Sequence, residues 1–216
     1  MHHVDLITII IIAANFIISM KGFNDIVFFE KYKFNIGSIR QGEQIRMFSS
    51  AFLHANFSHL LFNMITLYFF AGVVIRGIGV PKFLILYLVS LLLGNLLSFY
   101  FHRDQPHYSA IGASGAVMGV LYSAILLHPQ MGLYLFFIPI PIPAWLFGLA
   151  YLLYSIYGMK RQLGNIGHDA HIGGAIGGYV LTLLFVPSLF ATSLWIIVLL
   201  AVPLVVLFVL HKMGKV

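Results

Sequence analysis

The sequence contains no cysteine. This absence excludes disulfide bonds, a thiolate nucleophile and a metal site with cysteine ligands. Acidic residues are also scarce, because only six of the 216 residues are Asp or Glu. The spacing of His168 and His171 suits a pair of metal ligands, but the sequence has no HExxH pattern and no set of carboxylates to complete a zinc site. We therefore expect neither a metal nor another cofactor.

Charge is low throughout the chain. Charged residues make up 8% of the sequence and hydrophobic residues 61%, whereas about a quarter of the residues of an average soluble protein are charged. This composition predicts a protein that crosses a lipid bilayer several times. The net charge of +6 comes from twelve Lys and Arg scattered over short connections. Scattered cations favour contact with anionic lipid headgroups over nucleic-acid binding.

Long hydrophobic runs account for most of the chain. A bilayer-spanning α-helix needs about 20 mostly apolar residues. We therefore expect an all-α membrane helix bundle, a single domain over residues 1–216, because no soluble stretch is long enough for a second core. The N-terminus lacks the basic region and cleavage site of a secretory signal, so the first run is expected to be a retained span. The expected helices cover residues 4–20, 57–75, 83–101, 111–127, 143–157, 168–186 and 194–210.

Two connections have distinctive compositions. Residues 133–142 are apolar but end in alternating prolines, which cannot sustain a helix and predict an extended lead-in at the bilayer edge. Residues 21–55 interleave aromatic and charged side chains. This mixture is typical of the headgroup zone, so we expect the connection to lie on the membrane surface.

The distribution of Lys and Arg bears on orientation. With a cytoplasmic N-terminus, the cytoplasmic connections carry only Arg76 and Lys82, and the other ten Lys and Arg lie on the opposite side. The positive-inside rule therefore predicts the reverse orientation.

Ser114 is the first polar residue of interest. It lies in Gly112-Ala113-Ser114-Gly115, at the head of a hydrophobic run. A small packing residue is one interpretation, because serine is common where membrane helices touch. The other is a nucleophile, since free N–H groups and the helix dipole at a helix N-terminus suit a developing oxyanion. Gly112, Gly115 and Gly119 leave room for a close neighbour and for a substrate backbone.

His171 is the candidate base. Gly174, Ala175 and Gly178 share its helix face, and this stripe predicts a close approach to the Ser114 helix. A structural or proton-relay histidine is the alternative. Asp169 lies two residues before His171, which places it on roughly the opposite side of a helix. We therefore expect a Ser–His dyad without an acid, in which His171 takes the Ser114 proton and returns it to the leaving amine.

His59 and Asn63 are four residues apart, so both side chains project from one helix face. They are either a structural hydrogen-bonded pair or neutral donors to an oxyanion.

Taken together, these motifs resemble the rhomboid family of intramembrane serine proteases. The resemblance runs from about Glu43 to Tyr179. It rests on an ordered set of motifs: Phe52-Leu53-His54, His59 with Asn63, Gly112-Ala113-Ser114-Gly115, and Ala170-His171-Ile172-Gly173-Gly174.

The resemblance implies a role for each matched position. Ser114 would be the nucleophile and His171 the general base, while His59, Asn63 and the Ser114 N–H would form the oxyanion hole. His54 would support the first loop. The family's core has six helices, here at about residues 43–187, and the helix at about 194–210 would be an additional C-terminal one. Substrate would enter past the fifth helix and the loop after it, around Trp145 and residues 158–167.

Two positions depart from the family pattern. Met118 stands where many members have an aromatic that packs against the histidine, and Ile45-Arg46 replaces a Trp-Arg pair. The resemblance also implies a cytoplasmic N-terminus, against the charge count, and we follow the resemblance.

These observations predict an intramembrane serine endopeptidase that hydrolyses transmembrane protein substrates, as a multi-pass protein of the cell membrane. One alternative is a rhomboid-like protein that binds membrane helices without cleaving them. A transporter is the other, but its expected signs, intramembrane carboxylates or inverted repeats, are missing from the sequence.

Overall fold

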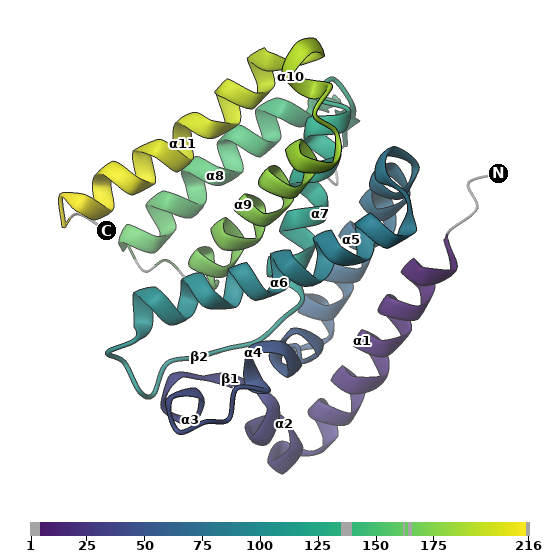
Figure 1. Cartoon of the computed structure of the whole chain (residues 1–216). Coiled ribbons are helices and arrows are strands. Elements are labelled where there is room, and N and C mark those ends of the chain that lie inside the picture. The colour runs from purple at the N-terminus through teal and green to yellow at the C-terminus, as the bar shows by residue number, and fades with distance from the viewer. Residues whose placement is uncertain (1–4, 135–139, 162, 164–165, 215–216) are drawn as a thin grey trace.

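The chain folds almost entirely into α-helices (Figure 1). The computed structural model describes residues 5–134, 140–161, 163 and 166–214. Each of the seven expected helices coincides with a helix of the structure, although Val4, where the first was expected to begin, lies outside the described residues. The long helices are α1 (Leu6–Asn24), α5 (Phe57–Ile78), α6 (Val80–His102), α7 (Ser114–Leu127), α8 (Ala144–Arg161), α9 (His168–Phe185) and α11 (Leu194–Lys212).

The outward faces of these helices are strongly apolar. Leu6, Phe69, Leu184 and Phe208 are each more than half exposed, as expected for side chains that face lipid rather than water. By length and composition α1, α5, α6 and α11 qualify as membrane spans, whereas α7 is a shorter apolar helix of 14 residues. The helical and apolar character predicted from the sequence is therefore confirmed.

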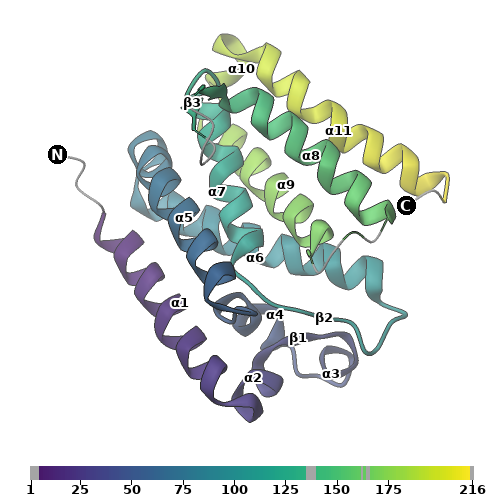
Figure 2. The same cartoon turned by 180° about the vertical axis from the view of Figure 1, so that it is seen from behind.

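The centre of the bundle is α7. Every residue from Gly115 to Leu126 is buried, because α7 packs against α5, α6, α8 and α9 (Figure 2). Lipid-exposed helices surround it, which is why α7 carries no polar outer face.

Small residues set the spacing between α7 and α9. A Cβ atom added at Gly174 would overlap the carbonyl group of Gly115, and one added at Gly178 would overlap the carbonyl group of Gly119. The two backbones therefore lie in direct contact, as the glycine stripe beside His171 predicted. On α6, a Cβ added at Gly94 would come within 2.7 Å of the Ala170 carbonyl oxygen, so α6 joins the same contact.

The connection between α1 and α5 is folded, a feature that the sequence did not predict. It contains α2 (Ile26–Tyr32), β1 (Phe34–Asn35), α3 (Ile36–Arg40), α4 (Arg46–Ser49) and the 3-10 helix η1 (Ser50–Phe52). Its position on the membrane surface stays a prediction.

Two groups of contacts fix this connection. Arg46 is buried and donates to the carbonyl oxygens of Glu30 and Lys33 at 2.7 and 3.0 Å. Strand β1 pairs antiparallel with β2 (Ser109–Ala110), which precedes the Ser114 helix. The connection is thereby tied to the segment that carries the candidate nucleophile.

At the opposite end of α7, β3 (Gly132–Leu133) pairs antiparallel with β4 (Ile142–Pro143). The described ends of the 133–142 segment are therefore extended, as predicted, while Pro139 lies outside the described residues.

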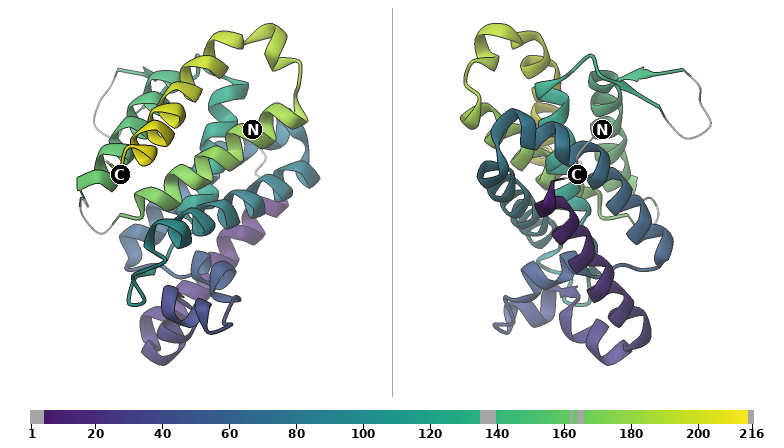
Figure 3. Two further views of the ribbon diagram at one scale, coloured as in Figure 1. Left: turned by 60° about the vertical axis from the view of Figure 1, so that its left-hand side comes forward. Right: turned by 90° about the vertical axis from the view of Figure 1, so that its right-hand side faces the viewer.

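The additional C-terminal helix follows α10 (Leu189–Thr192) and lies along α8 (Figure 3). Trp145 and Trp195 meet edge to face at 6.1 Å between ring centroids, and the Tyr179 hydroxyl donates to the Ile197 carbonyl oxygen at 2.9 Å.

Candidate active site

A cavity of about 790 Å³ lies at the N-terminal end of α7. Its walls come from α5, α6, α7, α8, α9 and the connections before α5, α7 and α9. The cavity brings together most of the predicted site residues, namely Ser114, His171, His59, Asn63, Gly112 and Gly115. Three motifs from separate parts of the sequence, His59 with Asn63, the segment around Ser114 and the segment around His171, therefore meet in one space.

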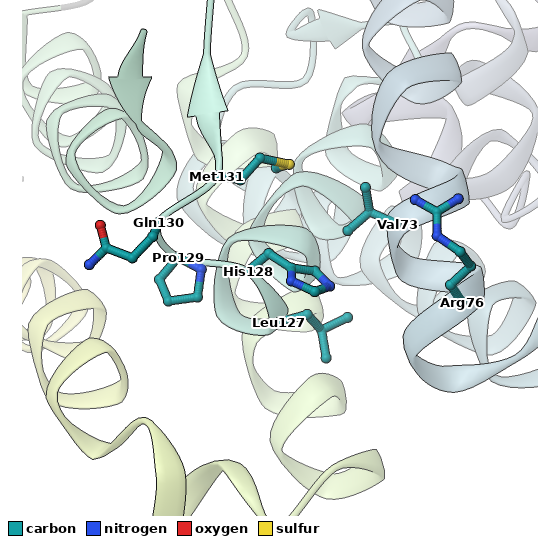
Figure 4. Close-up of a pocket in the computed structure, with 7 residues that line it drawn as sticks. All are labelled: Val73, Arg76, Leu127, His128, Pro129, Gln130 and Met131. Atoms are coloured by element: carbon teal, nitrogen blue, oxygen red, sulfur yellow. The ribbon is translucent and has the colours of Figure 1, made fainter. Parts of the chain in front are cut away.

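A second cavity, of about 500 Å³, lies at the other end of α5 and α7 (Figure 4). Arg76 lines it near the C-terminal end of α5, where the helix dipole favours a cation, and His128 lines it directly after α7. None of the predicted site residues and no serine or threonine appears among its described lining residues. The cavity beside Ser114 is therefore the candidate active site.

Ser114 is the first residue of α7, as predicted. The N–H groups of the first helical turn have no partner within the helix and can serve an anion at this end. The Ser114 side chain is half-buried and makes no hydrogen bond to any described residue. Its hydroxyl can therefore turn toward a base, and such contacts are often looser in a site without substrate.

Gly112 shapes the entrance to this helix. Its φ of +119° is favourable only for glycine. A Cβ atom at this position would lie 2.9 Å from Nε2 of His59 and 3.8 Å from Oγ of Ser114. The bare α-carbon thus lets the His59 ring and the Ser114 hydroxyl approach the same point.

The His171 ring is oriented by Tyr151, a residue that the sequence did not predict for the site. Nδ1 of His171 lies 2.7 Å from the hydroxyl of Tyr151 on α8. For Nε2 to accept a proton, Nδ1 must carry the hydrogen and donate it to the tyrosine oxygen. Tyr151 lies in an apolar run with no distinguishing pattern, so only the fold reveals the contact. The aromatic residue expected to pack against His171 is replaced by Met118, and Tyr151 supports the ring instead.

Asp169 does not contact His171, as the helical spacing predicted. Its carboxylate turns instead to α6, where Oδ2 lies 3.3 Å from Nε2 of His102. The orienting group of His171 is therefore a neutral phenol.

His59 and Asn63 line the cavity from α5. Nδ1 of His59 accepts the N–H of Ala55 at 3.4 Å, which leaves Nε2 protonated in the neutral ring. One N–H of the Asn63 amide donates to the His59 carbonyl oxygen at 3.0 Å, and the second remains available. Each side chain thus keeps one neutral donor for an oxyanion.

His54 lies behind this pair and is fully buried. The Ser19 hydroxyl donates to the Phe52 carbonyl oxygen at 2.8 Å, so it accepts from Nδ1 of His54, also at 2.8 Å. Nε2 of His54 then accepts the N–H of Ala113 at 3.5 Å. Burial and, as the smaller cause, the nearby His59 together lower the pKa of His54 to about 3. His54 is therefore a neutral bridge between α1, the first connection and the residue before Ser114.

Comparison with known proteins identifies the family of the chain. Residues 41–188 match the family described as "Rhomboid domain". The chain is 32% identical over 183 residues to "RHOMBOID-like protein 12, mitochondrial" of Arabidopsis thaliana, covering 77% of this chain and 54% of that protein. It is 33% identical over 138 residues to "Rhomboid protein 1, mitochondrial" of Saccharomyces cerevisiae, covering 62% and 40%.

A bacterial relative is similar to the same degree. "Rhomboid protease GlpG" of Klebsiella pneumoniae is 30% identical over 153 residues, which cover 69% of this chain and 50% of that protein. The chain thus spans about half the length of these relatives or less. The motifs that share one cavity and the match over residues 41–188 lead to one conclusion, that this chain is a multi-pass helical membrane protein and belongs to the rhomboid family.

Proposed function

We propose that the chain is an intramembrane serine endopeptidase that hydrolyses peptide bonds in or beside the transmembrane segments of other proteins. The observation that carries this proposal is the shared cavity, where the Ser114 hydroxyl and the His171 ring face the same space as two neutral donors. Relatives are named rhomboid proteases. A protein that only binds membrane helices would not need a nucleophile, a base and two oxyanion donors in one cavity.

The reaction follows from the roles of these groups. Oγ of Ser114 attacks the scissile carbonyl while Nε2 of His171 takes its proton. The oxyanion accepts hydrogen bonds from Nε2–H of His59, the free N–H of Asn63 and the backbone N–H of Ser114. His171 then protonates the leaving amine, and water hydrolyses the acyl-enzyme with His171 again as base. Ala55, Asn56 and Ile166 are exposed residues at the rim of the cavity and give water a route to it.

The fold suggests how the substrate arrives. The cavity is lined by Asn63 and Thr66 of α5 and by Tyr151 of α8, and among the described residues α5 and α8 do not pack extensively against each other. We infer that a transmembrane substrate enters from the lipid between these helices. The predicted entry loop 158–167 begins too early, because residues 158–161 are the end of α8, and Gln162, Gly164 and Asn165 lie outside the described residues.

The preferred substrate should be one whose transmembrane helix unwinds easily. An intact helix hides its carbonyl groups in hydrogen bonds, so a helix that unwinds easily, with Gly or Pro near small residues at the cut, should react faster. If a substrate with its helix breakers replaced by leucine were cleaved equally fast, this preference would be wrong.

We also propose an arrangement of the helices and an orientation of the chain in the membrane. The six-helix core combines α1 with the five long helices of residues 43–187, namely α5, α6, α7, α8 and α9. Helix α11 is the additional span, and the whole is one domain of the cell membrane. The N-terminus is cytoplasmic, so the cavity opens on the opposite side.

The experiment is cleavage of a transmembrane protein by the purified chain in liposomes. Ser114→Ala and His171→Ala should abolish cleavage, and removal of one donor, as in Asn63→Ala, should reduce it by about 10²–10³-fold. Ser58→Ala removes an exposed serine beside His59 and should cleave like the wild type. Undiminished cleavage by Ser114→Ala would overturn the proposal.

A further inference from the structure

A second pair of polar side chains joins α6 to α9 at the same end of the molecule as the cavity. His102 is the last residue of α6, and Asp169 lies in the first turn of α9. Nε2 of His102 lies 3.3 Å from Oδ2 of Asp169, and the side chains are 23% and 5% exposed. A carboxylate this deeply buried requires a partner.

The surroundings of His102 favour its protonated form. Its Nδ1 lies 3.0 Å from the amide oxygen of Gln105, so both ring nitrogens face oxygen acceptors. Only an imidazolium donates from both nitrogens. The ring of Tyr108 stacks on His102 with centroids 3.6 Å apart and an interplanar angle of 7°, an arrangement that also attracts a cation.

Neighbouring charges leave this assignment unchanged. Arg103 and Asp104 pair with each other at 3.5 Å and are largely exposed, and Arg40 donates to the Arg103 carbonyl oxygen. Burial and the charge of Asp169 raise the pKa of Tyr108, so the stacked phenol stays neutral. On α9, His168 is the residue next to Asp169.

The position of the pair links the two halves of the dyad. Tyr108 directly precedes β2 and lines the cavity on the segment that leads to Ser114. Asp169 is two residues before His171. Helix α6 touches both α7 and α9, because Gly94 of α6 lies against Gly115 of α7 and Ala170 of α9. A shift of His102 would therefore move the nucleophile segment relative to the base helix.

We propose that His102, held as an imidazolium by Asp169, is a positioning residue that sets the placement of Ser114 relative to His171. This inference rests on the proposed protease function. It predicts that activity depends on the charge of a residue that touches neither the substrate nor the dyad. It also predicts that activity falls at alkaline pH, when His102 loses its proton.

The test measures kcat and KM for a transmembrane substrate in liposomes, from about pH 6 to about pH 10, across the range where a partnered histidine titrates. The variants are His102→Gln, Asp169→Asn, their combination and His102→Arg. Asp104→Asn is the matched control, because it removes an exposed carboxylate two residues from His102. Thermal unfolding of each variant separates misfolding from misplacement.

His102→Gln and Asp169→Asn should each lower kcat about tenfold through misplaced reacting groups, with KM within about twofold of the wild type. The double variant should be no worse than either single one, because both break the same contact. His102→Arg should retain activity and lack the alkaline fall, since arginine stays charged. Asp104→Asn should behave like the wild type.

A wild-type kcat and pH profile in His102→Gln or in Asp169→Asn would overturn the inference, as would losses that multiply in the double variant. If His102→Gln fails to fold, an alkaline fall that persists unchanged in His102→Arg overturns it instead. A wild type that does not cleave, or a Ser114→Ala variant that does, would refute the protease proposal rather than this one.

Discussion

At the scale of single residues, the orientation of His171 depends on a phenol where many serine proteases use a carboxylate. A buried carboxylate beside His171 would need further partners or would take up a proton. The neutral Tyr151 hydroxyl avoids that cost and still fixes the ring through a 2.7 Å contact. The orienting effect should be smaller than that of an acid, because a neutral acceptor stabilises the imidazolium less.

Replacing Tyr151 by phenylalanine should therefore slow the reaction without abolishing it. The variant keeps the ring but removes the acceptor of Nδ1–H, so we expect kcat to fall about tenfold with little change in KM. Tyr154→Phe is the matched control, because Tyr154 packs edge to face on His168 and not on His171. Equal rates for the two variants would contradict the proposed role of Tyr151.

His54 should make the fold sensitive to acid. Its pKa in the folded protein is about 3, against an ordinary value of 6.5. The unfolded chain therefore binds this proton first, so the contribution of His54 is complete above pH 6.5 and is lost as the pH falls toward 3. The melting temperature of the wild type should fall over this range.

A variant isolates this contribution. His54→Asn should have a lower melting temperature near neutral pH but a weaker dependence on acid, whereas His107→Asn, at an exposed histidine, should keep the wild-type slope. The same slope in all three proteins would show that His54 does not carry the effect.

At the scale of elements, the contact between α7 and α9 decides whether a dyad forms. Ser114 and His171 start these two helices, and the helices can bring the side chains together only if their backbones touch. Gly174 against Gly115 and Gly178 against Gly119 provide that contact. In a membrane such packing replaces the hydrophobic effect as the force between helices.

Gly174→Ala should be strongly destabilising. The new Cβ meets the backbone of Gly115, which cannot rotate away. We expect a loss of about 3 kcal/mol, at the upper end for overpacking, together with loss of cleavage, measured by thermal unfolding in detergent and by the liposome assay. Gly72→Ala is the control, because its Cβ would meet only the flexible end of Arg76 at 3.2 Å. Similar stability for the two variants would contradict the close packing of α7 and α9.

The elements differ in how far the sequence predicts them. All seven long helices coincide with hydrophobic runs of the sequence, although by length and composition only α1, α5, α6 and α11 qualify as membrane spans among the described residues. The glycine stripe beside His171 predicts its partner helix. The short helices between α1 and α5 do not, since α2, α3 and α4 have only four to seven residues each. The contacts of Tyr151 with His171 and of His102 with Asp169 could not be predicted, because each joins side chains of two different helices and no local pattern encodes it.

At the scale of the whole molecule, cations gather at the end that holds the cavity. Lys31, Arg103, Arg161 and Lys212 belong to connections or helix ends on that side, and Arg76 and Lys82 to the other. Several cations at this end are occupied within the protein, as Arg46 is by two backbone carbonyl groups. A cation bound in this way interacts less with the membrane surface than a free one, which weakens the charge count as a predictor of orientation.

The orientation can be measured directly, because the chain has no cysteine of its own. Lys31→Cys and Lys82→Cys each introduce one exposed thiol, at opposite ends of the molecule. With the proposed cytoplasmic N-terminus, a membrane-impermeant maleimide added to intact cells should label Lys31→Cys and leave Lys82→Cys unlabelled until the cells are lysed. The reverse pattern would place the cavity on the cytoplasmic side.

The proposed reaction depends on an imidazole on α9 that activates the hydroxyl at the start of α7. Its most direct test is to treat the purified protein with a serine-reactive fluorophosphonate and to locate the adduct by mass spectrometry. We expect a single adduct on Ser114, formed slowly or not at all in His171→Ala. An adduct on another serine, or one on Ser114 that forms at the wild-type rate without His171, would contradict it.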